Sequence, residues 1–253
     1  MKKQVEWISH RGESIDAPEN TLSAFQLAME RDTDGIETDI HLTADGILVC
    51  IHDSDTGRVG NRDIHIESST FAEAETLDVS NGKPEFKGEK IPTFRSVLNL
   101  LKPGKLFYVE VKENDERVLP AMLREIDAAG VPHEQIVMIS FHKEIVLASK
   151  RYMPDIKTLW LTGFEENNAD GTFSPTPEET IAFLKSAKAD GIDACALEKA
   201  FDAKYIKALK DAGYHVAIWT VDQEDAARRY LERGVDSITS NCAAKLCKAI
   251  EGR

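Results

Sequence analysis

The chain has 253 residues, of which 42% are apolar, and its formal net charge is −13 at pH 7. This length is typical of a single α/β barrel, and the apolar content is sufficient for a full-sized core. The acidic balance argues against non-specific nucleic-acid binding, which needs a basic face, and the sequence has no run of 18 apolar residues that would predict a membrane span.

Apolar, β-branched runs alternate with amphipathic helical patterns, which predicts repeated strand–helix units and a parallel sheet. Strands are predicted at 4–9, 35–40, 47–52, 106–112, 136–141, 157–162, 193–198, 215–221 and 236–239. Helices are predicted at 20–31, 93–102, 115–129, 143–152, 176–189, 202–212 and 222–233, and either Asn20 or Thr21 can cap the first. The predicted fold class is an α/β TIM (β/α)8 barrel with a small insertion after the third strand.

The nine strand candidates exceed by one the eight that a barrel needs. The step from 35–40 to 47–52 is too short for a helical crossover, and 236–239 is the weakest candidate, so the sequence leaves open which one lies outside the barrel. Residues 54–91 are the only long stretch with weak periodicity. We expect one barrel domain over 1–253, in which the segment at about 54–91 is a cap-like insertion on the upper rim that faces the substrate.

Two carboxylates stand close together on one predicted strand. Glu37 and Asp39 are two residues apart, so both side chains point to the same side. Glu110, at the end of another strand, would complete an all-oxygen site, which favours one Mg²⁺ or Ca²⁺ ion over zinc. A single pair of this kind could equally form surface salt bridges. The metal interpretation is favoured because other strands also end in catalytic residue types.

Two histidines, His10 and His52, each end an apolar strand and are each followed by a charged residue. A lone histidine there is more often a hydrogen-bonded structural residue, whereas two of them favour general acid–base catalysis near neutral pH. Arg11 and Lys112 are the candidates for binding a phosphate group, Arg11 as a bidentate fork and Lys112 as a point charge.

The C-terminal ends of barrel strands form one face of the molecule, where catalytic residues gather. The polar candidates all end predicted strands, so we expect them to meet at one site. Phe141 and Trp219 lie at the same strand ends. They form either an apolar wall for the alcohol part of a substrate or part of the barrel core, and the sequence supports both interpretations about equally.

Several motifs follow one another in a characteristic order and spacing. They are His10-Arg11-Gly12, Ala17-Pro18-Glu19-Asn20-Thr21, Glu37-Thr38-Asp39-Ile40, Leu42-Thr43-Ala44-Asp45-Gly46, Val49-Cys50-Ile51-His52-Asp53, Gly57-Arg58, Ile91-Pro92-Thr93-Phe94, Val109-Glu110-Val111-Lys112, Ser140-Phe141 and Trp219-Thr220-Val221. Together they resemble the glycerophosphodiester phosphodiesterase family over nearly the whole chain. One departure is Ile238-Thr239-Ser240-Asn241, which stands where many members have an Asp followed shortly by Pro. It affects the predicted closing loop of the barrel and not the chemistry.

The resemblance implies a TIM barrel and metal-dependent cleavage of glycerophosphodiesters to glycerol 3-phosphate and a free alcohol. It also implies specific roles: His10 and His52 as the acid/base pair, Arg11 and Lys112 as phosphate contacts, and Glu37, Asp39 and Glu110 as ligands of the divalent cation. The attacking group could be water or the glycerol 2-hydroxyl of the substrate, and either histidine could be the base.

Three alternatives accompany this hypothesis. A phosphodiesterase of the same family could act on lysophospholipids or another headgroup, although residues 54–91 carry no apolar stripe that would hold a lipid chain. A sugar-phosphate isomerase would not require two strand-end histidines beside an arginine, and a non-catalytic binding protein should have lost one of the candidate residues.

The expected partner is a small, water-soluble glycerophosphodiester, with no nucleic acid and no membrane span, and the sequence does not specify an oligomeric state. Because no apolar leader follows Met1-Lys2-Lys3, the location expected from the sequence is cytoplasmic, or periplasmic or secreted if an export signal has been removed.

Overall fold

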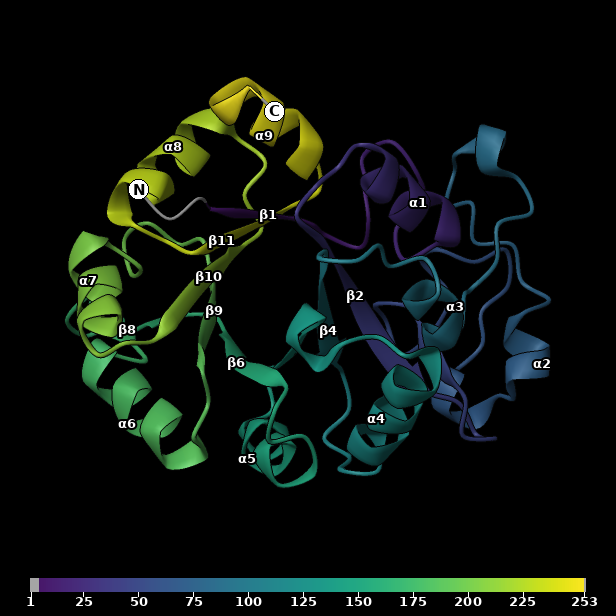
Figure 1. Cartoon of the computed structure of the whole chain (residues 1–253), viewed down its shortest axis with the longest axis horizontal. Coiled ribbons are helices and arrows are strands. Elements are labelled where there is room, and N and C mark those ends of the chain that lie inside the picture. Colours follow the sequence, from purple (N-terminus) through teal and green to yellow (C-terminus); the bar gives the residue numbers. More distant parts are fainter. Residues whose placement is uncertain (1–4, 253) are drawn as a thin grey trace.

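The computed structural model describes residues 5–252, and within this range eight parallel strands close into a barrel that helices surround (Figure 1). Closure follows from β1, which pairs in parallel with both β2 and β11. The barrel strands are β1 (Glu6–Ser9), β2 (Gly35–Leu42), β4 (Leu106–Val111), β5 (Ile136–Ser140), β6 (Lys157–Thr162), β9 (Gly191–Cys195), β10 (His215–Trp219) and β11 (Ser237–Ser240). The predicted TIM-barrel class is confirmed. The start of the first predicted strand at residue 4, and Met1-Lys2-Lys3, lie outside the described residues.

The strand outside the barrel is β3 (Leu48–Cys50), which pairs antiparallel with the upper end of β2. The ranking of 236–239 as the weakest candidate is wrong, because β11 pairs along its full length with β1 and closes the barrel. Its Ser-Ile-Thr-Ser sequence gives little apolar signal. The polar side chains of β11 are nevertheless buried, and Ser237 and Ser240 bond to other buried or half-buried polar groups.

The helices of the outer ring agree with the predicted ones, apart from a C-terminal helix that was not predicted. Thr21, and not Asn20, caps the first helix, since its side chain accepts from the backbone N–H of Ala24. Thr176 and Glu179 form a capping box. The helices are α1 (Leu22–Glu30), α3 (Phe94–Leu98), α4 (Val118–Ala129), α5 (Lys143–Tyr152), α6 (Pro177–Ala187), α7 (Ala203–Asp211), α8 (Glu224–Arg233) and the unpredicted α9 (Ala243–Glu251).

Apolar side chains fill two layers. Trp7, Phe25 and Phe107 are fully buried between the strands and the surrounding helices. Inside the barrel, an apolar cluster includes Ile8 and Leu159. Burying a side chain of this size contributes about 1.5–3 kcal/mol, so these layers hold the strands rigidly in place. At the C-terminal strand ends, polar side chains replace the apolar filling.

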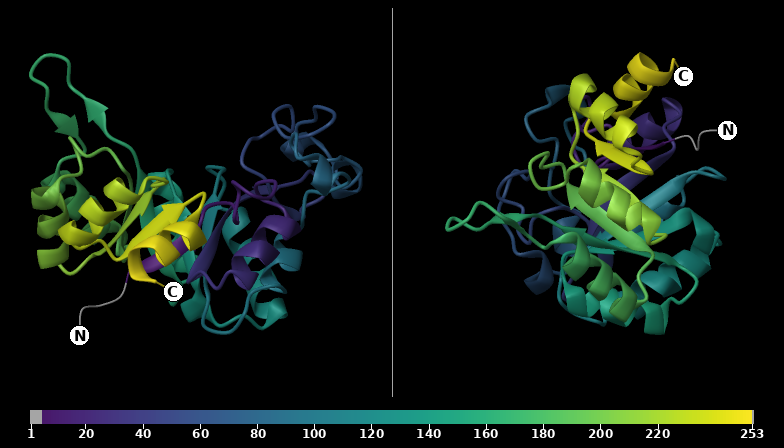
Figure 2. Two further views of the ribbon diagram at one scale, coloured as in Figure 1. Left: turned by 90° about the horizontal axis from the view of Figure 1, so that it is seen from above. Right: turned by 90° about the vertical axis from the view of Figure 1, so that its left-hand side faces the viewer.

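Two extensions rise from the same end of the barrel (Figure 2, left). One is the segment 54–91, which contains η1 (Ile66–Ser68), α2 (Phe71–Ala74) and η2 (Pro84–Phe86) and packs its own small apolar cluster against Val49 and Ile51. The other is the hairpin of β7 (Glu165–Glu166) and β8 (Phe173–Ser174). Lys83 ties the first extension to the barrel, because its Nζ donates to the backbone oxygens of Ser14 and Ala17 at 2.7 and 2.5 Å. The cap-like role of 54–91 stays a prediction.

In the described part of the chain, the helices are all too short or too polar to cross a lipid bilayer.

Candidate active site

A cavity opens at the C-terminal ends of the barrel strands, and the structure brings all nine predicted site residues to it. Seven of them line it directly: His10, Arg11, Glu37, His52, Glu110, Phe141 and Trp219. The other two, Asp39 and Lys112, are in contact with these. Asp39 Oδ2 lies 3.3 Å from Nε of Arg11, and Lys112 Nζ lies 2.9 Å from Glu110 Oε1. Residues far apart in the sequence therefore meet as their strand-end positions predict.

Three carboxylates converge on one point of this cavity. Glu37 and Asp39 project from the same side of β2, and Glu110 lies in register with Asp39 on the neighbouring β4. Each offers one oxygen, and these oxygens all lie within 4.8 Å of one another. All three side chains are buried. Like charges at this distance and depth repel strongly.

The carboxylates respond to this crowding with shifted pKa values. Burial, followed by the charge of Asp39, raises the pKa of Glu37 well above its ordinary value and that of Glu110 to about 8. Burial acts in the same direction on Asp39, but the charges of Arg11 and Lys112 outweigh it and hold the pKa of Asp39 below its usual range. The three groups therefore cannot all be ionised near neutral pH unless further positive charge is present.

The donor set fits a hard divalent cation. All three candidate ligands supply oxygen, which suits Mg²⁺ or Ca²⁺. Oδ1 of Asp39 is buried; Lys112 Nζ lies 3.5 Å from it, but it accepts no hydrogen bond from any residue in 5–252. A buried carboxylate oxygen of this kind calls for another ligand, and a cation between the three groups would provide it.

The turn after β1 presents Arg11 to the carboxylates. Arg11 has φ 55° and Gly12 has φ 79°, both in the left-handed region. A Cβ at Gly12 would lie 2.5 Å from the backbone carbon of Ala24, so the turn requires glycine there. The backbone N–H of Arg11 donates to Glu37 Oε2 at 3.0 Å, and its guanidinium Nε lies 3.3 Å from Asp39 Oδ2.

Hydrogen bonds from the C-terminal part of the chain orient His10. Its Nδ1 lies 2.7 Å from Oδ1 of Asn241, and Nδ2 of Asn241 donates to Asp222 at 2.7 Å. Since the amide oxygen faces the ring, Nδ1 carries the proton and Nε2 has a free lone pair. Burial, followed by the charge of Arg11, lowers the pKa of His10, so the neutral ring is favoured.

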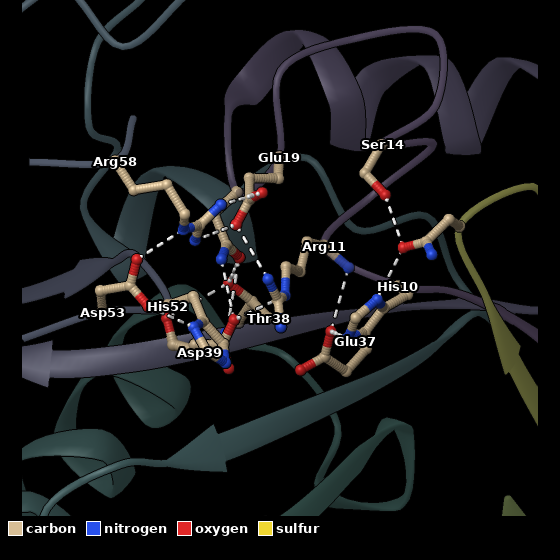
Figure 3. Close-up of polar contacts among 12 residues, drawn as sticks. His10, Arg11, Ser14, Glu19, Glu37, Thr38, Asp39, His52, Asp53 and Arg58 are labelled. Carbon is tan, nitrogen blue, oxygen red and sulfur yellow. Dashed lines mark hydrogen bonds and ion pairs between the residues drawn. The ribbon is translucent and has the colours of Figure 1, made fainter. Parts of the chain in front are cut away.

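A carboxylate orients His52. Nδ1 of His52 lies 2.7 Å from Asp53 Oδ1. Arg58, from the segment 54–91, donates through Nε to Asp53 at 2.6 Å and through both terminal nitrogens to Glu19 at 2.7 and 2.8 Å. Glu19 also accepts from Arg11 at 2.9 Å. Arg58 thus links the partners of His52 and Arg11 (Figure 3).

The apolar side of the cavity is formed by two aromatic rings and two aliphatic side chains. The rings of Phe141 and Trp219 meet edge to face, with centroids 5.7 Å apart. Phe141 is 43% exposed, which argues against the alternative that it packs in the barrel core. Ile139 and Leu161 continue the same surface.

Several polar residues in or beside the cavity were not predicted from the sequence as site residues. Asn20 was considered only as a helix cap, but its Nδ2 donates to Asp39 at 2.8 Å and its Oδ1 accepts from Thr38 at 2.7 Å. Its position in the Ala17-Pro18-Glu19-Asn20-Thr21 motif was the available signal. The others are Glu19, Asp53, Arg58, Asp193, Asp222, Thr239 and Asn241.

A profile described as the glycerophosphoryl diester phosphodiesterase family matches residues 10–245. The chain belongs to this family. The sequence-based recognition is confirmed, and so is the enzyme class, that of the glycerophosphodiester phosphodiesterases.

Individual family members are similar over most of their length. A glycerophosphodiester phosphodiesterase of Caldanaerobacter subterraneus is 29% identical, over 92% of this chain and 93% of its own. One of Bacillus subtilis is 25% identical, over 92% of this chain and 82% of its own. An Oleispira antarctica phosphodiesterase, solved in complex with the product sn-glycerol-3-phosphate, is 25% identical and superposes with a TM-score of 0.86 over 97% of this chain and 96% of its own.

Proposed function

We propose that this chain hydrolyses glycerophosphodiesters to glycerol 3-phosphate and an alcohol, with one divalent cation, Mg²⁺ or Ca²⁺, and with His10 and His52 as the acid/base pair. The observation that carries the proposal is the meeting of three buried carboxylates, within 4.8 Å of one another, with two oriented histidines at one cavity. Family membership and the glycerol 3-phosphate complex of the Oleispira relative support the choice of substrate.

In this proposal, two positively charged side chains, each following a barrel strand, bind the phosphate group of the substrate. Arg11 follows β1 and Lys112 follows β4, and both lie beside Asp39. A cation held by Glu37, Asp39 and Glu110 would supply the further charge that stabilises the phosphate oxygens in the transition state. Arg11 and Lys112 hold the phosphate between the two histidines, so that proton transfer can occur on both sides of the phosphorus.

The hydrogen-bond partners of the histidines suggest which is the base. His10 donates through Nδ1 to an uncharged amide, so it favours the neutral form, whose Nε2 can take a proton from the attacking water or 2-hydroxyl. His52 donates to the carboxylate of Asp53, which stabilises an imidazolium better than an amide does. Burial lowers the pKa of His52, and the charges of Arg11 and Lys112 act in the same direction, while Asp39 and Asp53 oppose that shift. We assign His10 as the base and His52 as the acid that protonates the leaving alcohol.

The apolar wall of Phe141 and Trp219 would contact the organic part of the diester, and the segment 54–91 would form the rim that distinguishes headgroups. Because Phe141 is substantially exposed, the departing alcohol can leave past it. We therefore expect tolerance of several headgroups together with a strict demand for the glycerophosphate half.

The test is a turnover screen of glycerophosphocholine, glycerophosphoethanolamine, glycerophosphoglycerol and glycerophosphoinositol, with a lysophospholipid for comparison. Each is assayed with excess EDTA and after Mg²⁺ or Ca²⁺ is restored. The proposal predicts glycerol 3-phosphate from the soluble diesters, loss of activity in EDTA and recovery with the cation. Strong preference for the lysophospholipid would favour the alternative substrate, and full activity in chelator after dialysis would refute the metal assignment.

A further inference from the structure

Asp193 is a buried acid in the active-site cavity that has no role in the proposed acid–base catalysis, metal binding or phosphate binding. It lies on β9 with 1% of its surface exposed, and it lines the same cavity as His10 and His52. No hydrogen bond or ion pair to its carboxyl group is formed by any residue between 5 and 252, and Oδ1 is fully enclosed. A buried carboxyl group without a partner is costly for the folded protein, so its presence indicates a ligand.

The neighbours of Asp193 leave space for a small ligand and do not neutralise the acid. In register beside it on β10 is Ala217, and on β6 is Leu161, neither of which can form a hydrogen bond through its side chain. The indole N–H of Trp219 donates to the backbone oxygen of Asp193 at 3.3 Å and leaves the carboxyl group free. Thr239 lines the same cavity with a hydroxyl group that also lacks a partner among the described residues.

The combination of apolar walls and unpaired hydrogen-bonding groups suits a polyol. The carbon-bound hydrogens of a polyol pack well against aromatic and aliphatic side chains, while its hydroxyl groups need polar partners. The floor of the cavity at Asp193 and Thr239 is enclosed, whereas the rim at Phe141 is 43% exposed and can accept headgroups of different sizes. The small half that all glycerophosphodiesters share is therefore the part that suits the enclosed position.

We propose that Asp193, with Thr239 beside the same cavity, binds a hydroxyl group of the glycerol moiety and so selects glycerol-containing diesters. This inference rests on the proposed function. Asp193 is then a specificity residue that touches the substrate and takes no part in proton transfer. A site that binds a substrate hydroxyl discriminates against analogues that lack it, since the polar group of the protein is then left unpaired.

The test compares Asp193→Ala and Asp193→Asn with wild-type protein on the four glycerophosphodiesters and on bis(4-nitrophenyl) phosphate, which has no glycerol. For Asp193→Ala, we expect kcat/KM to fall by about 10- to 100-fold on every glycerophosphodiester and by less than about threefold on the nitrophenyl diester. Asp193→Asn keeps an acceptor of the same shape and should recover most of the loss. Thr239→Val should show the same selectivity with a smaller loss.

A binding measurement completes the test and does not depend on turnover of the natural substrate. Inhibition of nitrophenyl diester hydrolysis by glycerol 3-phosphate should weaken about 10-fold or more in Asp193→Ala, while inhibition by inorganic phosphate stays unchanged. Equal losses on all substrates would mean a structural role and overturn the inference, as would losses confined to the choline and ethanolamine substrates. If wild-type protein hydrolyses only the nitrophenyl diester, the proposed function itself fails, which is a distinguishable result.

Discussion

The two ends of the barrel each contain a cluster of buried or half-buried polar groups, but only one cluster is complete by itself. At the N-terminal ends of the strands, the Ser237 hydroxyl bonds to Tyr108, Glu6 and His215, each at 2.8 Å. At the C-terminal ends, three carboxylates crowd together and oxygens of Asp39 and Asp193 lack hydrogen bonds within the described chain. A complete network stabilises the fold, whereas an incomplete one indicates that a ligand supplies what is absent.

Histidines occur at both ends of the barrel, so substituting them tests the contrast between the two clusters. His10→Ala and His52→Ala should each lower turnover by about 10²–10⁴-fold, the usual effect of losing an acid or base. The matched control is His215→Gln at the other end, which should leave kcat within about threefold and lower the melting temperature instead. Steady-state kinetics and thermal unfolding measure both effects. Near wild-type rates in His10→Ala or His52→Ala would make that histidine structural.

The carboxylates of the active-site cavity should have the next largest effect on activity. Glu37→Ala and Asp39→Ala should lower activity by about 10²–10³-fold, because a cation held by fewer ligands stabilises less charge in the transition state. The fold should survive, since removing one of three crowded acids relieves repulsion. Glu6→Ala, which removes a partner of Ser237 at the opposite end, should instead reduce stability and leave activity largely intact. Reduced stability with normal activity in Glu37→Ala or Asp39→Ala, or reduced activity with normal stability in Glu6→Ala, would contradict the contrast between the two ends.

Asn241 tests whether the orientation of His10 matters. Asn241→Leu removes the acceptor of the Nδ1 proton, so more of the ring should adopt the inactive tautomer and kcat should fall about 10- to 100-fold. The acid limb of the kcat/KM profile should move as well, because this hydrogen bond raises the pKa of His10, and its loss should shift the limb to lower pH. Ser14→Ala removes another contact of Asn241 and serves as the control. An unchanged pH profile would argue against this positioning role.

Arg58 should have the smallest effect. Arg58→Ala removes the link between Asp53 and Glu19 and should lower kcat/KM by about three- to tenfold, with little change in melting temperature because exposed ion pairs contribute little stability. Arg62→Ala, in the same segment but 3.8 Å from Glu73 and away from the cavity, is the matched control. Equal effects of the two substitutions would remove the case for positioning by Arg58.

Some of these features could be predicted from the sequence alone, and others could not. The barrel and the meeting of the nine candidate residues at one cavity were predictable, because the C-terminal ends of barrel strands lie on one face. The partner of His10 was not, since Asn241 is 231 residues away and reaches it only through the pairing of β1 with β11. Asp193 was not marked, because it stands at the start of the predicted strand 193–198, whereas in the structure it is the middle residue of β9. Barrel strands bury both faces and give no alternation that marks an inward residue.

The wrong ranking of 236–239 as the weakest barrel strand has a similar cause. Local apolar character favours residues 47–52 over 236–239, but membership of the barrel depends on which strand pairs with β1. Residues after Asp45-Gly46 turn back antiparallel onto β2, so they cannot enter a parallel barrel. The short polar β11 can, because the side chains of Ser237 and Ser240 bond to other polar groups inside the protein.

The central claim is that the crowded carboxylates hold a divalent cation, and calorimetric titration of chelator-treated protein with Mg²⁺ or Ca²⁺ tests it most directly. Burial and the charge of Asp39 raise the pKa of Glu37 and bring that of Glu110 to about 8. Glu110 is therefore largely protonated at pH 6.5, and the cation must displace its proton. We predict one site per chain, proton release on binding, and affinity that rises from pH 6.5 to 8.5, all lost in Glu37→Gln. Absence of binding, or binding that neither pH nor Glu37→Gln affects, would contradict the account.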